Sequence, residues 1–197
     1  MHTLLHYHIT RMALSEFDAL ISFLADLPPA KGPLHRQLWR HVNDDWQEKI
    51  SELLLQLNIP RKYWPGVYAH IFQDYLWFKK IRRHYFNRNS IDFHRCIEIR
   101  WTLHYFRAKK IDAASMLSSI KESESEAIIF LNLFDETDLS RVNSIIHKIF
   151  EPFLHGKYRA RCVADSEKDK LQKILRLIDK AFNEEEFIEA SRSFATP

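Results

Sequence analysis

Apolar residues recur at steps of three and four along most of the chain, which is the spacing of one buried face of an α-helix. Between residues 39 and 57 they stand at Trp39, Val42, Trp46, Ile50 and Leu53. The same spacing predicts helices over 15–27, 34–57, 65–86, 91–109, 112–120 and 138–151, and two C-terminal helices within 166–191. Residues 1–12 fit either a helix or an extended arm.

Capping residues and prolines mark the ends of these helices. Ser15 with Asp18 has the pattern of a capping box, and Pro28 and Pro29 stop the helix that it opens. Pro65 suits the first turn of a helix, and Pro152 is expected to end one. Further predicted caps are Ser90, Asp112, Thr137 or Asp138, and Ser166 with Asp169.

The periodic segments and their short connections predict an all-α fold. We expect residues 1–197 to form a single domain, a bundle of about eight or nine helices around a central aromatic-rich helical hairpin at residues 65–109. Only three glycines occur in the chain, whereas sheets with tight hairpins usually need more. An all-β fold and a Gly-rich phosphate loop are therefore not expected.

The charge is concentrated in the basic and aromatic centre, residues 60–110. This stretch holds twelve Lys or Arg against three acids, a net charge of +9, while the whole chain carries +3. Dense cations beside aromatic rings are typical of polyanion binding, although such aromatics also serve a core. We expect a non-enzymatic binding protein whose basic face docks nucleic acid. The predicted contacts are Lys79, Lys80, Arg82, Arg83, Arg88, Arg95, Lys109 and Lys110.

A protein–protein adaptor or accessory subunit is the alternative. Residues 111–156 carry eight acids against three bases, so basic and acidic faces are segregated along the chain. Such faces could steer an acidic and a basic protein to different surfaces. The run of Glu122, Glu124 and Glu126 could also dock a basic partner or fold back on the protein's own basic tip, near Lys79–Arg88.

Histidine–acid pairs at helical i,i+4 spacing allow a third reading, a metal-dependent helical enzyme. His70 with Asp74 and His94 with Glu98 share the pattern His-x3-acid-x2-Trp, and their helices are expected to be neighbours. No cofactor is predicted, and a divalent metal at these four residues is the one candidate. His41 with Asp45 and His147 with Glu151 repeat the spacing, and His84 and His104 are spare candidates.

Other chemistry has little support. Cys96 and Cys162 lack a reactive-thiol signature and suit a reducing, cytoplasmic compartment. The N-terminus lacks the apolar core of a secretory signal, and the longest apolar run, 127–131, is too short to span a bilayer. No feature indicates a small-molecule substrate.

The residues Leu4, His6, His8 and Leu24-Ala25-Asp26 resemble the start of acyl-carrier-protein phosphodiesterases. The resemblance is confined to residues 4–26. Ala69, Gln73 and Asp74 stand where that pattern would place Asp, Asp and His, so the activity is not carried over.

Overall fold

The computed structural model describes residues 1–36, 46–82, 91–155, 168–182 and 185–193. Throughout these ranges the secondary structure is helical and includes no strand, which confirms the all-α multi-helix bundle. The first half contains α1 (Thr3–Ala13), α2 (Glu16–Ala25), α3 (Lys31–Arg36), α4 (Trp46–Gln56), the 3-10 turn η1 (Arg61–Tyr63), α5 (Trp64–Leu76) and the π-helical turn η2 (Trp77–Arg82). The second half contains α7 (Ile91–Lys109), α8 (Ala113–Glu122), α9 (Glu124–Leu131), α10 (Leu139–Leu154), α11 (Lys168–Phe182) and α12 (Glu185–Ser193).

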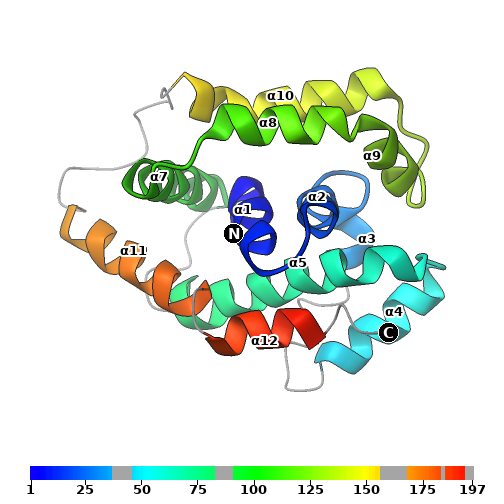
Figure 1. Ribbon diagram of the computed structural model, residues 1–197, viewed down its shortest axis with the longest axis horizontal. Helices are drawn as coiled ribbons and strands as arrows, with labels where there is room; N and C mark the ends of the chain where they lie inside the picture. Colours follow the sequence, from blue (N-terminus) through cyan, green and yellow to red (C-terminus); the bar gives the residue numbers. More distant parts are fainter. Residues whose placement is uncertain (37–45, 83–90, 156–167, 183–184, 194–197) are drawn as a thin grey trace.

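The helices α1 and α2 lie in the middle of the molecule. In Figure 1, α8 and α10 pass on one side of this pair, and α5 and α12 pass on the other. The two helices pack extensively on each other, and α2 also packs along α5. Apolar side chains on several sides of α1 and α2 are fully buried, among them Leu4, Leu5, Ile9, Ile21 and Phe23. Polar groups on these two helices are therefore also carried into the interior.

Gly66 allows α2 and α5 to approach closely. A β-carbon at this position would lie 2.6 Å from Cβ of Ile21 and 2.7 Å from the carbonyl oxygen of Asp18. Both distances are far inside ordinary van der Waals contact, and one of the two atoms belongs to the backbone of α2. Because a backbone cannot rotate away as a side chain can, any larger residue at position 66 must separate the helices.

The aromatic residues of the basic centre belong largely to the core. Tyr63, Trp64, Trp77, Trp101 and Tyr105 are all buried. The indole rings of Trp77 and Trp101 lie 5.9 Å apart, where η2 meets α7. Hydrophobic burial therefore accounts for these rings, which are not available to stack on bases. Tyr85 and Phe86 lie outside the described residues.

Most predicted helix ends are confirmed. The Ser15–Asp18 capping box is formed, and Asp112 and Asp138 cap α8 and α10 through their carboxylates. The ambiguous first residues form the helix α1. Ser90 and Ser166 lie outside the described residues.

Two boundaries differ from the prediction, and a third falls partly outside the described residues. α3 and α4 cover the two ends of the expected helix over 34–57, and residues 37–45 are not described. The regular part of the 65–86 helix ends at Leu76 and gives way to η2. Pro152 does not end α10, which continues to Leu154, because a proline's φ fits a helix and only one backbone hydrogen bond is lost.

None of the described helices combines the length and the apolar character that are needed to cross a bilayer.

Replacing Gly66 with Ala should destabilise the protein, because the added methyl group overlaps α2. We expect a loss of about 1–3 kcal/mol in the free energy of unfolding, measured by urea denaturation. Gly32→Ala is the matched control, since a β-carbon there meets nothing within 4 Å. That variant should be neutral or gain up to about 1 kcal/mol from helix propensity. Equal stabilities for the two variants would contradict the close packing inferred for α2 and α5.

Candidate metal centre

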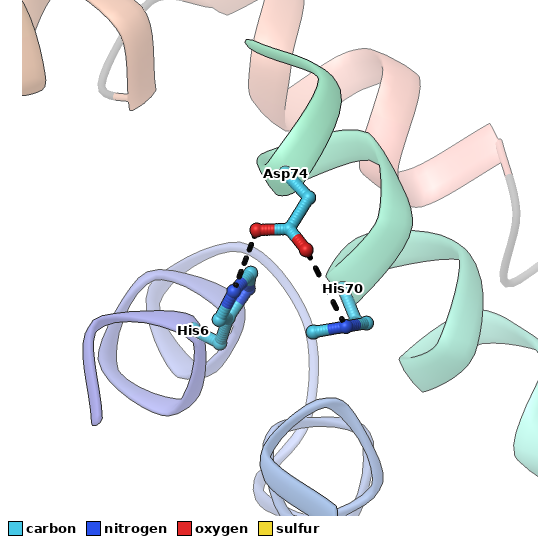
Figure 2. A group of neighbouring side chains, drawn as sticks. All are labelled: His6, His70 and Asp74. Carbon is cyan, nitrogen blue, oxygen red and sulfur yellow. Dashed lines mark ion pairs between the residues drawn. The ribbon is translucent and has the colours of Figure 1, made fainter. Parts of the chain in front are cut away.

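Four helical segments bring imidazoles and carboxylates together beside α1. His6 comes from α1, His70 and Asp74 come from successive turns of α5, Asp26 caps the end of α2, and His35 lies on α3. Figure 2 shows the first three of these side chains, with His6 and His70 both turned toward the Asp74 carboxylate. His6 and His70 are fully buried, and their ring centroids are 4.2 Å apart. These residue types in this density are typical of metal centres.

A chain of hydrogen bonds assigns the neutral tautomer of His6. The Gln73 amide nitrogen lies 2.6 Å from the Thr10 hydroxyl, to which it donates, and Thr10 in turn donates to Ser22 at 3.0 Å. The Gln73 amide oxygen therefore faces Nδ1 of His6, at 3.0 Å. Because an amide oxygen only accepts, Nδ1 must carry the proton, and Nε2 of the neutral ring holds a lone pair.

Nε2 of His6 lies close to a carboxylate, 3.1 Å from Oδ1 of Asp74. A ring protonated on both nitrogens forms an ion pair with Asp74 at this distance, whereas in the neutral ring Nε2 carries a lone pair and two acceptor atoms face each other. A cation bound between Nε2 and Oδ1 would remove that repulsion.

His70 is the second imidazole with an unsatisfied atom. Its Nε2 lies 2.8 Å from Nε2 of His35 and 3.8 Å from Oδ2 of Asp74. Its Nδ1 is buried and has no hydrogen-bond partner among the described residues. A buried polar atom left unpaired costs about 1–3 kcal/mol, and an ion bound at Nε2 would not relieve this cost.

Asp26 is held by two donors at the edge of the cluster. The Thr3 hydroxyl donates to Oδ2 and the Lys31 ammonium donates to Oδ1, each at 2.5 Å. The Asp26 carboxylate is almost fully buried, whereas the Lys31 side chain is 47% exposed. Lys31 therefore brings a cation from the surface to the rim of the site.

The ionisation states follow from burial and from these charges. Burial lowers the pKa of His70 well below its usual value, and burial also lowers the pKa of His35, so both rings are neutral near pH 7. Burial alone would raise the pKa of Asp26, but the Lys31 ammonium lowers it. Burial would likewise raise the pKa of Asp74, but the α-amino group of Met1 and His6 hold it well below its usual value. Neutral imidazoles and ionised carboxylates are the forms that bind metals.

Two overlapping sets of side chains have their potential ligand atoms within 4.8 Å of one another. One set is His6, His70 and Asp74, and the other is Asp26, His35 and His70. The carboxylates supply hard oxygen ligands and the imidazoles supply nitrogen, a combination suited to Zn²⁺, Mn²⁺, Fe²⁺ or Ni²⁺.

The structure joins only part of the predicted metal site. His70 and Asp74 lie at the centre of the cluster, as the i,i+4 spacing predicts. Glu98 accepts a hydrogen bond from the Trp77 indole nitrogen at 3.2 Å and lies 3.8 Å from the α-amino group of Met1, which is itself 3.0 Å from Asp74. The side chain of His94 lies outside the described residues.

The remaining histidine–acid pairs do not join the cluster in the part of the chain that can be described. His147 and Glu151 are both exposed on α10. His104 belongs to neither ligand set, and the pKa of its ring is lowered by partial burial and then by Arg100 and Arg107. His41, Asp45 and His84 lie outside the described residues, and so do the side chains of Cys96 and Cys162.

The predicted polyanion-binding residues are only partly described. Lys79 is exposed and donates to the Tyr75 hydroxyl, Lys109 forms an ion pair with Asp179 at 2.8 Å, and Lys110 is exposed at the end of α7. Lys80 is partly exposed. Arg83 and Arg88, with the side chains of Arg82 and Arg95, lie outside the described residues. Nucleic-acid binding at this face stays a prediction, as does the adaptor role.

One acid of the acidic segment does reach the basic centre. The carboxylate of Glu126 on α9 accepts from the Lys62 ammonium at 2.7 Å and from the Tyr63 hydroxyl at 2.6 Å. This contact is made at Lys62 and not at the basic tip near Lys79–Arg88.

The i,i+4 pattern of histidines and acids did not predict three of the five cluster residues as metal ligands. Asp26 and His35 have no acid or histidine partner at helical spacing, and the one such partner of His6 is His2, because the cluster partners of all three lie on other helices. For His6 and Asp26 the one available signal was their place in the resemblance at residues 4–26. His35 carried no local signal.

Acid should destabilise the metal-stripped protein through buried histidines. Desolvation lowers the pKa of His2 to about 3, whereas the unfolded chain takes this proton near pH 6.5. The unfolded state therefore binds more protons below pH 6.5, and stability falls from there toward pH 3. His2→Asn keeps a side chain that can cap α1. Between pH 6.5 and 5, the free energy of unfolding of this variant should fall by roughly 1–2 kcal/mol less than that of the wild type.

Urea unfolding at several pH values measures this difference. His147→Asn is the matched control, because His147 is exposed on α10, and its pH profile should follow that of the wild type. An unchanged profile for His2→Asn would contradict the neutral state of His2, a half-buried residue, in the folded protein.

Comparisons with known proteins identify no relative. No protein-family model, no curated protein and no solved structure matches the chain. The similarity of residues 4–26 to acyl-carrier-protein phosphodiesterases therefore stays a resemblance, and the cluster itself is the basis for assigning a function.

Proposed function

We propose that the protein is a metal-dependent hydrolase whose divalent ion is held by His6, His70 and Asp74. The observation that carries the proposal is the approach of Nε2 of the fully buried His6 to within 3.1 Å of Oδ1 of Asp74. A divalent cation between these two atoms would be bound by both.

The surroundings of His6 support a metal ligand over a structural histidine. Metal-binding imidazoles usually donate their second N–H to a fixed acceptor, which sets the tautomer and aims the other nitrogen at the ion. The Gln73 amide does this for His6, and Thr10 and Ser22 hold the amide in place. All four of these side chains are fully buried. A structural histidine would need no such support on one nitrogen while leaving the other unpaired.

The number of ligands supports catalysis over a structural role. Structural zinc sites are closed by four protein ligands, whereas catalytic sites keep at least one position for water or substrate. The set His6, His70 and Asp74 supplies three ligands. The Asp74 side chain is 17% exposed, so solvent reaches the edge of this ligand set. A bound divalent ion would supply acidified water as the nucleophile.

Metal binding is the first test. The chelator-stripped protein, dialysed against Mn²⁺ or Zn²⁺, should retain the metal and unfold at a higher temperature, because a ligand at a hundred times its Kd stabilises by about 2.7 kcal/mol. Asp74→Asn should abolish both effects. Glu151→Gln, at an exposed carboxylate, should leave both unchanged. Retention of metal by Asp74→Asn equal to that of the wild type would rule out this centre.

The role of Gln73 gives a second test. Gln73→Met keeps the size of the side chain but removes the acceptor for His6 Nδ1, and should weaken metal binding by roughly 10- to 100-fold. Gln56→Met is the matched control on the exposed surface of α4 and should bind as the wild type does. Isothermal titration calorimetry compares the two. Equal affinities would show that the tautomer of His6 has no part in binding.

Hydrolysis is tested on the metal-loaded protein with chromogenic phosphate esters, carboxylate esters and amides. We expect turnover of at least one class, lost on chelation, restored by the metal and absent in Asp74→Asn. Tight metal binding without turnover of any class would support the centre but argue against a hydrolase.

A further inference from the structure

We infer that the site holds two divalent cations, with a second ion bound by Asp26, His35 and His70 and with Asp74 bridging the two positions. The inference rests on the proposed function, since it adds a cation beside the one held by His6 and Asp74. The second set of ligand atoms lies within 4.8 Å of one another on three separate elements, α2, α3 and α5. We call these the inner and the outer position.

The Asp74 carboxylate presents a different oxygen to each position. Oδ1 lies 3.1 Å from Nε2 of His6, while Oδ2 lies 3.8 Å from Nε2 of His70. A carboxylate with imidazoles on both of its oxygens can bind one ion through each. Paired ions in hydrolytic centres are held in this way, at a separation of about 3.5–4 Å.

His70 is shared between the two sets, and its geometry favours the outer ion when both positions are filled. Its Nε2 has one lone pair and lies 2.8 Å from Nε2 of His35. Two imidazole nitrogens at this distance either share a proton or direct both lone pairs at one ion. The outer ion would therefore take His35 and His70, and the inner ion would keep His6 and Asp74, with water completing its shell.

Lys31 competes with the outer ion for Asp26. Its ammonium donates to Oδ1 of Asp26 at 2.5 Å, which is the carboxylate that the outer ion needs. Because the Lys31 side chain is 47% exposed, it can turn into solvent when an ion arrives. Thr3 remains on Oδ2 and keeps the carboxylate in place. Removing this lysine should therefore strengthen metal binding, an outcome opposite to that of losing a structural ion pair.

Equilibrium dialysis of the full chain against Mn²⁺, with the bound metal measured by elemental analysis, tests the inference. The wild type should saturate at two Mn²⁺ per chain. Asp26→Asn and His35→Gln should each saturate at one, with circular dichroism confirming that they are folded. Lys31→Met should keep two ions and bind the second roughly fivefold to tenfold more tightly. Electron paramagnetic resonance should show coupled Mn²⁺ in the wild type and uncoupled Mn²⁺ in Asp26→Asn.

Lys62→Met is the matched control for Lys31→Met. Lys62 is also an exposed lysine paired with a carboxylate, that of Glu126 on α9, and its loss should leave both affinities unchanged. Saturation of the wild type at one ion, or a second affinity that Lys31→Met leaves unchanged or weakens, would overturn the outer position. Saturation at zero would instead overturn the proposed function, so the two failures are distinguishable.

Discussion

The hydrogen bond between Nδ1 of His6 and the amide oxygen of Gln73 is the interaction on which the candidate site depends. It holds the other nitrogen of a fully buried ring against a carboxylate. Reversing the Gln73 amide would place a donor against His6 and allow Nε2 to donate to Asp74, which would satisfy the pair without an ion. Thr10 opposes that reversal, because its hydroxyl accepts from the amide nitrogen and donates onward to Ser22.

The hydrogen-bonded series His6, Gln73, Thr10 and Ser22 lies in the interior because other helices surround the elements that carry it. The pair α1 and α2 lies in the middle of the bundle, so polar side chains on their inner faces are removed from water together with the apolar ones (Figure 1). In this environment a mispaired group is costly, and a fully paired network is correspondingly specific. The helix packing that forms the core therefore also fixes the positions of the polar side chains in the candidate site.

The sequence predicted the elements well because helical periodicity and capping are local. The Ser15–Asp18 box, the caps at Asp112 and Asp138 and the i,i+4 approach of His70 to Asp74 all involve residues within one helical turn. The rest of the site is not local. His6 meets Gln73 across 67 positions of the chain, and His35 meets His70 across 35, so no spacing rule could join them. The charge of the basic centre was easier to see, but many of its aromatic rings serve the core.

Gly66 has a consequence beyond stability. It stands one turn before His70 and two turns before Asp74 on α5, so all three share one side of that helix. The side that comes closest to α2 at the glycine is therefore the side that carries the imidazole and the carboxylate toward α1. In the proposed metal centre, the absence of a side chain at position 66 would therefore help to set the spacing between ligands on different helices, and with it the size of ion that fits.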